Sequence, residues 1–192
     1  GIAYFVLKYR MPKEDRNIPL GDAYQAMRTV RDSAEVWHIN KNDVGIMGFS
    51  AGGHLASSVS THAEEAVRPN FSILFYPVIS MDERITHKGS CVNFLGEERK
   101  TNAKLVEEWS NDKAVRPQVT PRVILLMSSD DKVVPPVTNG VAYYTAMNKA
   151  GNECTLHIYP SGGHGWGFRN TAQGFRYHVQ MLDDLTTWLQ HF

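Results

Sequence analysis

Three kinds of residue in this sequence could together carry out nucleophilic chemistry: a serine between glycines, a pair of aspartates and a late histidine. Residues 48–52, with Ser50 at the centre, fit the pattern G-x-S-x-G. In that pattern a strand turns sharply into a helix and holds the serine hydroxyl out at the apex. Both flanking positions, Gly48 and Gly52, are expected to be glycine because the two backbones approach too closely for side chains. The alternative is a tight strand-to-helix turn without chemistry, but the apolar run at 44–47 favours the first interpretation.

Partners for the serine follow later in the chain. Asp130 and Asp131 come after the apolar run 122–127, and His164 comes after the run 154–159 in a glycine-rich loop. A serine hydroxyl is a weak nucleophile until a base removes its proton. A neutral imidazole can take that proton and return it to the leaving group, while a carboxylate fixes the imidazole tautomer and stabilises the imidazolium. These residue types therefore predict a serine nucleophile with a histidine base and an orienting aspartate.

The base and the acid must be chosen among several candidates. His164 is favoured because its loop leaves the imidazole free to reach Ser50, whereas His54, close behind the elbow, is expected to pack or hydrogen-bond on its helix. Asp131 is favoured as the acid because a turn and a proline follow it, and Asp130 is expected to cap that turn or to be solvated. The other histidines lie on predicted helices, surface loops or a strand, except one in an irregular region that could line a pocket: His38, His62, His157, His178, His191 and, in the irregular region, His87.

The elements that must position these residues alternate between strand and helix. Apolar strands are predicted at 2–9, 44–47, 71–78, 122–127 and 154–159. Helices are predicted at 23–37 with Asp22 as the N-cap, after the elbow, at 137–150, and at the C-terminus with an apolar face. That face is expected to contain Phe175, Val179, Leu182, Leu185 and Leu189. Because the apolar strands show little polar alternation, we expect an α/β fold with a mostly parallel sheet of about five strands and helices on both faces. Ligands bind such sheets at the carboxyl ends of the strands.

The bulk composition limits the classes of function. At 192 residues, the chain is expected to form one domain over 1–192, with residues 80–120, irregular but for short helices at 91–95 and 103–109, as a pocket-lining or lid insertion. Twenty Lys and Arg balance twenty Asp and Glu, so neither a nucleic acid nor an anionic membrane is an expected partner. No apolar run approaches the roughly 18 residues of a membrane span. Cys91 and Cys154 lack metal-ligand spacing and are expected to be free, and nothing calls for a metal or an organic cofactor. Localisation is left open, because the chain begins abruptly.

Three stretches together resemble a known family: 49–56 around the serine, 130–135 after the fourth strand, and 157–165 before and around His164. They are similar to the α/β-hydrolase esterases and, within them, to the carbohydrate-esterase branch of acetyl xylan esterase-like proteins, often labelled xylanase-B-like. Residues 8–12, 76–80 and 86–90 fit that branch too. The resemblance implies Ser50 as nucleophile, His164 as base and Asp131 as orienting acid. It also implies hydrolysis of short acyl esters, especially acetyl esters on xylan-derived or other plant carbohydrates.

The resemblance is incomplete at the N-terminus. Such esterases usually carry a His-Gly-Gly or Gly-Gly-Gly loop upstream whose N–H groups stabilise the oxyanion, and no such loop precedes Gly1. The N–H of Ala51 is the one oxyanion donor expected here. The family also places a further strand between the strand carrying Tyr9 and the elbow strand, so either those two strands pair directly or another chain or segment fills the slot. An exposed edge would favour self-association into a homo-oligomer.

Two other functions remain open from the sequence: a truncated hydrolase-fold domain with little activity that acts through association, and a peptidase or lipase of the same fold. Three residues are candidates for the substrate pocket, namely Tyr76, His87 and Trp166. For each of them, core packing or simple surface exposure is an equally valid interpretation.

Overall fold

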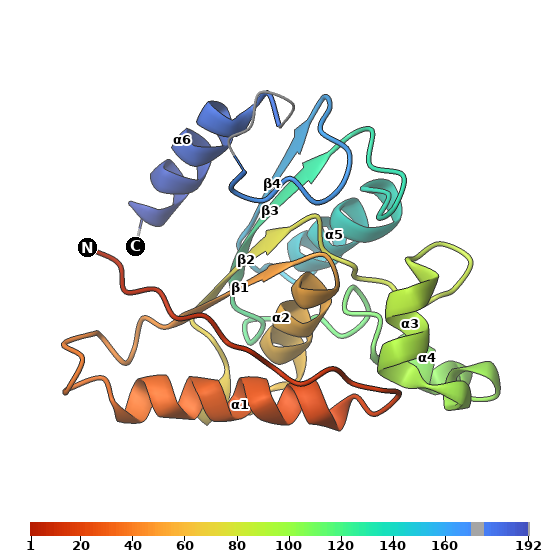
Figure 1. Ribbon diagram of the computed structural model, residues 1–192, viewed down its shortest axis with the longest axis horizontal. Helices are drawn as coiled ribbons and strands as arrows, with labels where there is room; N and C mark the ends of the chain where they lie inside the picture. The colour runs from red at the N-terminus through yellow and green to blue at the C-terminus, as the bar shows by residue number, and fades with distance from the viewer. Residues whose placement is uncertain (170–174, 192) are drawn as a thin grey trace.

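Four parallel strands form the centre of the molecule in a computed structural model, which describes residues 1–169 and 175–191 (Figure 1). The strands are β1 (Gly45–Phe49), β2 (Phe71–Phe75), β3 (Arg122–Ser128) and β4 (Cys154–Tyr159), in the spatial order β1-β2-β3-β4. Their register aligns Phe49 with Phe75, Phe75 with Leu126, and Ser128 with Tyr159, so all four carboxyl ends lie along one edge of the sheet. The predicted parallel α/β fold is confirmed.

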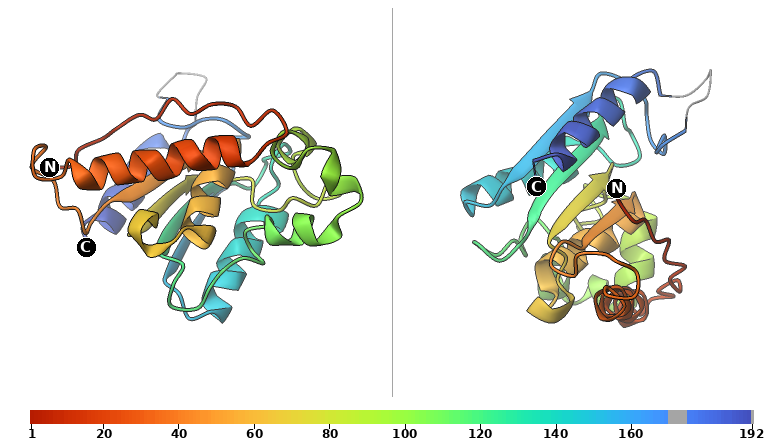
Figure 2. Two further views of the ribbon diagram at one scale, coloured as in Figure 1. Left: turned by 90° about the horizontal axis from the view of Figure 1, so that it is seen from below. Right: turned by 90° about the vertical axis from the view of Figure 1, so that its left-hand side faces the viewer.

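Helices cover both faces of this sheet. They are α1 (Asn17–Asp32), α2 (Ala51–His62), α3 (Lys88–Leu95), α4 (Ala103–Glu108), α5 (Ala142–Lys149) and α6 (His178–Leu189), with short 3₁₀ turns at Glu65–Val67 and Glu97–Lys100 and a π-helical turn at Val137–Val141. Figure 2 shows α6 on one side of the sheet, with α2 and α1 on the other. The two central strands, β2 and β3, are therefore buried on both faces, as their apolar sequence predicts, whereas β1 and β4 at the sides of the sheet are mostly half-buried.

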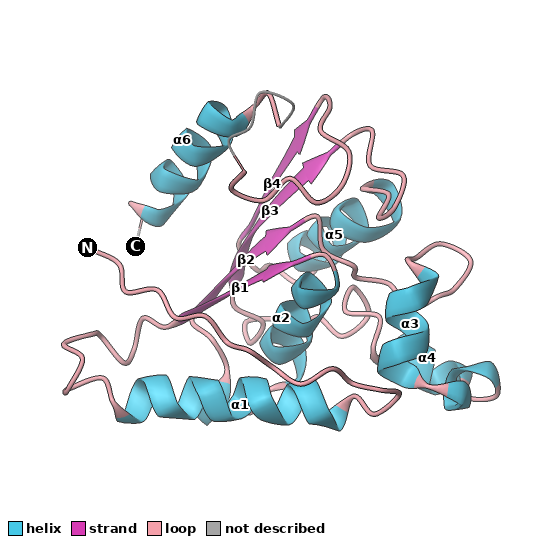
Figure 3. Cartoon of the chain, viewed as in Figure 1, coloured by secondary structure: helices cyan, strands magenta, loops and turns pink. Residues whose placement is uncertain are grey.

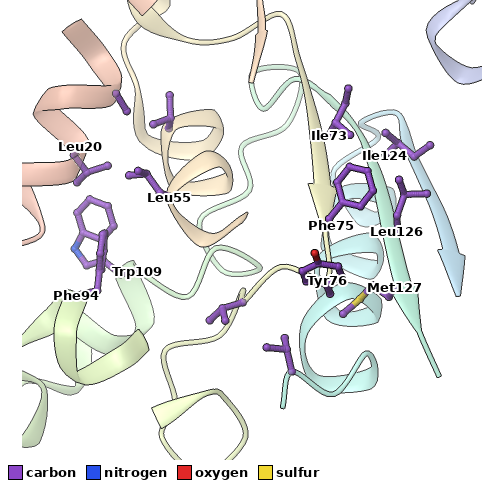
Figure 4. Packing of buried hydrophobic residues seen from close by; sticks show 14 of the residues in the cluster. Leu20, Leu55, Ile73, Phe75, Tyr76, Phe94, Trp109, Ile124, Leu126 and Met127 are labelled. Carbon is purple, nitrogen blue, oxygen red and sulfur yellow. The ribbon is translucent and has the colours of Figure 1, made fainter. Parts of the chain in front are cut away.

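Alternate residues of the strands supply the two sides of the core. Leu74 and Leu125 pack with Tyr143 and Met147 of α5 in one cluster. Their neighbours along the strands belong to the second cluster, which also contains the buried side of α6: Ile73, Phe75, Ile124 and Leu126 with Met181, Leu185 and Trp188. Figure 4 shows the strand residues of this second set, Ile73, Phe75, Ile124 and Leu126, side by side on β2 and β3.

The prediction of a strand at 2–9 is wrong. Residues 1–12 contain no strand or helix and run as an extended segment beside α1 (Figure 3), with Ile2 and Val6 75% and 83% exposed. β-propensity describes side chains that fit a pleated surface, but a strand forms only where a neighbour completes its hydrogen bonds. Among the described residues β1 pairs on one side, with β2, so direct pairing of 2–9 with the elbow strand does not occur. Self-association at the β1 edge stays a prediction.

Two helices differ in detail from the prediction. Asp22 is not an N-cap: it lies within α1, and its carboxylate accepts hydrogen bonds from the backbone and guanidinium of Arg10 at 2.7–3.2 Å. In α6 the buried residues are Met181, Leu185 and Trp188, whereas Val179 is 73% exposed. The helix begins at His178, and its buried residues are spaced three or four positions apart from Met181 onwards, which places them on one face. The predicted face was therefore right only in part.

The long connection between β2 and β3 packs beside α1 and α2. The short helices predicted at 91–95 and 103–109 are confirmed as α3 and α4. The ring of Phe94 lies 4.7 Å from that of His54, and Trp109 stacks on His62 at 4.3 Å. Both cysteines are free, Cys91 fully buried and Cys154 partly so. A lid role for this connection stays a prediction.

Within the part of the chain that the structure describes, no helix is both long enough and apolar enough to cross a membrane.

His54 is a packing residue of α2, as its position in the sequence predicts, and it should make the fold sensitive to acid. It is 2% exposed, and its Nε2 donates to the carbonyl of Trp109 at 2.9 Å. Burial lowers the pKa of His54 to about 4. In the unfolded chain the pKa of a histidine is near 6.5. Between about pH 4 and pH 6.5, His54 is therefore protonated in the unfolded state but neutral in the folded state. Stability is therefore lost as the pH falls from about 6.5 towards 4.

The measurement is urea unfolding at pH 7 and pH 4.5, for the wild-type chain and for His54→Gln, whose amide does not titrate. The wild-type chain should lose about 2–3 kcal/mol more of its free energy of unfolding over this interval than the variant does. Equal losses in the two proteins would show that His54 is not the group responsible.

Candidate active site

Ser50 occupies a strained turn between β1 and α2. Its backbone has φ 54° and ψ −119°, a region that non-glycine residues rarely adopt. Three backbone hydrogen bonds hold it there: Ser50 N–H donates to Phe75 O at 3.0 Å, and Ser50 O accepts from the N–H groups of His54 and Val78 at 3.2 and 3.1 Å. Strain of this kind persists where the surrounding structure over-determines it, and it is common at functional sites. The turn is thus the elbow that the pattern predicts.

The close approach of strand and helix requires only one of the two glycines that the pattern suggests. A Cβ at Gly48 would overlap the carbonyl of Gly52, so the expectation for Gly48 is confirmed. A Cβ at Gly52 would meet only the hydroxyl of Tyr9, at an ordinary 3.6 Å, so the steric reason expected there is wrong. The second crowded position is Gly53, where a Cβ would come within 2.7 Å of the Pro77 side chain.

The structure brings three of the predicted site residues into one hydrogen-bonded chain. His164 Nδ1 lies 2.7 Å from Asp131 Oδ2, and His164 Nε2 lies 2.7 Å from Ser50 Oγ. Because an ionised carboxylate can only accept, Nδ1 carries the proton and the neutral ring accepts the Ser50 hydroxyl proton at Nε2. The Asp131 side chain is fully buried and that of His164 is 16% exposed. The arrangement can draw a proton from Ser50, which is itself half-buried.

Asp131 is held by its own turn. Its Oδ1 accepts from the backbone N–H groups of Val133 and Val134, both at 2.9 Å, which leaves Oδ2 for the imidazole. The carboxylate is therefore fixed at both oxygens before the histidine approaches. The sequence signal for this arrangement is the turn after Asp131.

Asp130 does more than cap a turn or face solvent. It is exposed, but its Oδ1 accepts from the N–H of Gly163 at 2.8 Å, and this hydrogen bond lowers the pKa of the Asp130 carboxyl. The two adjacent aspartates thus hold the same loop, one through its backbone and the other through His164. No sequence pattern marked this second contact, because its donor is a backbone N–H, which every residue except proline carries.

Ala51 is the first residue of α2 and is exposed beside Ser50. The N–H groups of the first helical turn have no intrahelical acceptor, and the N-terminus of a helix favours negative charge. The position of Ala51 suits its predicted role as the donor to the oxyanion, and that role stays a prediction.

The three candidate pocket residues lie in different surroundings. Tyr76 is buried at the end of β2 (Figure 4), and its ring centroid lies 4.7 Å from that of His164. Trp166 is 5% exposed, stacks on Phe175 at 3.9 Å and donates from Nε1 to Ser128 Oγ. His87 is exposed and caps α3, its Nδ1 lying 3.3 Å from the N–H of Ser90. Tyr76 therefore touches the hydrogen-bonded chain, while the other two have other contacts.

One exposed aromatic residue, which contacts the neighbour of Ser50 in the chain, was not predicted from the sequence. Phe168 is 43% exposed, and its ring lies edge-on to that of Phe49, the residue before Ser50, at 6.0 Å. Phe49 in turn stacks on Phe75 at 4.6 Å. An aromatic residue in the segment after His164 is the signal that could have found this contact. Among residues 1–169 and 175–191, no group of three or more His, Cys, Asp or Glu side chains is arranged to hold a metal ion.

Known proteins are similar to this chain in sequence and in fold. A family described as having the alpha/beta hydrolase fold matches residues 2–168. The chain is 60% identical over 190 residues to an acetylxylan esterase of Xylanibacter ruminicola, covering 99% of this chain and 39% of that protein. It is 32% identical over 180 residues to endo-1,4-beta-xylanase B of Butyrivibrio fibrisolvens, covering 86% and 28%. The chain thus spans about two fifths or less of the length of these relatives.

A solved structure agrees with these matches. The acetyl ester-xyloside bifunctional hydrolase of Caldicellulosiruptor lactoaceticus superimposes with a TM-score of 0.82 at 33% identity, covering 95% of this chain and 70% of that one. The sheet, the elbow and the matched family agree with the resemblance inferred from the sequence. The chain belongs to the α/β-hydrolase fold family.

Proposed function

We propose that this chain carries the catalytic centre of a serine esterase that hydrolyses short acyl esters. The observation that carries the proposal is the hydrogen-bonded chain Ser50–His164–Asp131, with 2.7 Å at each step to the imidazole. These residue types in this order are sufficient for acyl transfer without a metal or an organic cofactor.

The reaction follows from the donors and acceptors. Ser50 Oγ attacks the acyl carbonyl carbon while its proton passes to His164 Nε2, and the N–H of Ala51 donates to the developing oxyanion. Asp131 Oδ2 stabilises the imidazolium. The tetrahedral intermediate expels the alcohol, which takes the proton from Nε2, and Ser50 is left acylated. Water then attacks the acyl group with His164 again as base, which releases the acid and restores the serine.

The substrate class is proposed as acetyl esters on xylan-derived or other plant carbohydrates. Support comes from the relative named acetylxylan esterase and from the structural neighbour named acetyl ester-xyloside bifunctional hydrolase. The ring of Phe168, which is 43% exposed and lies edge-on to the ring of Phe49, is proposed as a surface on which the apolar face of a sugar ring packs. Tyr76 is proposed to contribute by packing its ring against the imidazole of His164, which holds that imidazole in place.

The test is acetate release from acetylated xylo-oligosaccharides, measured beside p-nitrophenyl esters of two, four and twelve carbons and a feruloyl ester. We expect acetate release from the oligosaccharides and the highest kcat/KM among the p-nitrophenyl esters for acetate. A preference for the twelve-carbon ester would favour a lipase, and cleavage of peptide anilides would favour a peptidase. Release at the buffer rate from all substrates would exclude an esterase and favour a domain that acts through association.

A further inference from the structure

We infer that Asn139 is a positioning residue of this site: it fixes the distance between the segment after β2, which is bonded to the Ser50 backbone, and the loop that carries Asp131. The inference rests on the proposed function, since it concerns the same three side chains. Asn139 lies in the π-helical turn Val137–Val141, within the helix predicted at 137–150 but outside the stretches that resemble the family, and it is fully buried. In that turn the N–H of Val141 donates to the carbonyl of Pro136, five residues back. Such turns are rare and are often found at functional sites.

The oxygen and the nitrogen of the Asn139 amide form hydrogen bonds with two different loops. Its Oδ1 accepts from the backbone N–H groups of Ile79 and Ser80 at 2.9 and 3.3 Å, in the segment that follows β2. Its Nδ2 donates to the carbonyl of Pro135 at 3.1 Å, in the loop that follows β3. One buried side chain therefore ties the ends of two neighbouring strands together.

Each of these loops is bonded in turn to a residue of the proposed mechanism. Next to Ile79, the N–H of Val78 donates to the carbonyl of Ser50 at 3.1 Å. Next to Pro135, the N–H of Val134 donates to Asp131 Oδ1 at 2.9 Å. Together with the bonds through His164, these contacts form a closed ring that runs from the Ser50 backbone through Asn139 to Asp131, and through the imidazole back to Ser50 Oγ.

The ring has a geometric consequence. The imidazole must bridge Asp131 Oδ2 and Ser50 Oγ with 2.7 Å on each side, so it tolerates little change in the separation of those two groups. A displacement of about 1 Å at a reacting group can cost about a hundredfold in rate. Asn139 is the member of the ring that joins the two loops on the side away from the imidazole. Its loss should therefore disturb the approach of His164 to Ser50 more than the binding of substrate.

The test compares Asn139→Asp and Asn139→Ala with Asn111→Ala. Asn111 is a matched control because it is also fully buried, and its Nδ2 donates to His54 O, Ser57 Oγ and Ser58 Oγ at 2.7–3.2 Å, outside the ring. Asn139→Asp is the variant closest in shape: it keeps an acceptor for Ile79 and Ser80, and as the ionised carboxylate it places a second acceptor, in place of the donor, against the carbonyl of Pro135. We expect kcat for p-nitrophenyl acetate, per folded molecule, to fall about 10- to 100-fold in the Asn139 variants, with KM changed less than threefold. The control should lose thermal stability but keep kcat within twofold.

A second readout does not depend on turnover. The proton between His164 Nδ1 and Asp131 should give a downfield ¹H NMR signal that is absent in Asp131→Asn, and we expect it to weaken or shift in Asn139→Asp but not in Asn111→Ala. Wild-type kcat together with an unchanged signal in folded Asn139→Asp would overturn the inference, even if Asn139→Ala fails to fold. A wild-type chain without turnover would contradict the proposed function instead, and the NMR comparison alone would then decide the role of Asn139.

Discussion

Replacing Ser50 by alanine is expected to lower kcat for p-nitrophenyl acetate by about a millionfold, which is the size of effect seen when a serine nucleophile is removed from a triad. The reason is local. Ser50 Oγ is the atom 2.7 Å from His164 Nε2, and the strained turn that presents it is held by Phe75, His54 and Val78 through backbone bonds that alanine keeps. The variant should therefore fold as the wild-type chain does and lose only the covalent step.

A neighbouring serine provides the control. Ser129 lies at the same edge of the sheet, just after β3, and it is exposed. Ser129→Ala should keep kcat within about twofold, as surface substitutions usually do. The two variants should be assayed for the burst of p-nitrophenol that marks an acyl-enzyme, which Ser50→Ala must lack. A burst in Ser50→Ala would mean that another side chain takes the acyl group.

The hydrogen-bonded chain could be predicted because the sequence places each of its residues just after a strand. Ser50 follows β1, Asp131 follows β3 and His164 follows β4, and parallel strands bring their carboxyl ends to one edge. The contact of Asp130 with Gly163 and the ring through Asn139 could not be predicted. Both depend on which way a side chain turns at the end of a strand, and no local pattern records that direction.

Burial was harder to predict than position. Trp166 comes two residues after His164, so its place in the chain suggests a pocket residue, yet it is covered by stacking on Phe175. The apolar run at 2–9 has the composition of a buried strand, yet it lies without strand partners along α1. In both cases the outcome depends on which distant residues are available to pack or to pair, and propensity contains no information about that.

Asp131→Asn is the second change with a large expected effect, because the turn around Asp131 determines which way the new amide must lie. Oδ1 of Asp131 accepts from two backbone N–H groups, those of Val133 and Val134. The asparagine will keep its oxygen there, since its NH₂ group cannot accept. The NH₂ group then faces His164 and donates to Nδ1, so the proton of the neutral ring moves to Nε2 and points at Ser50. A ring in that tautomer cannot take the serine proton.

We therefore expect kcat to fall by about 10⁴-fold in Asp131→Asn with little change in KM, the magnitude known for this substitution in a serine protease triad. Asp130→Asn is the matched comparison, because an amide oxygen can still accept from Gly163, and its kcat should fall less than about tenfold. The comparison separates two carboxylates that are adjacent in the chain and that hold the same loop. Equal losses in the two variants would mean that both aspartates act by holding the loop, and that Asp131 does not act by fixing the tautomer of His164.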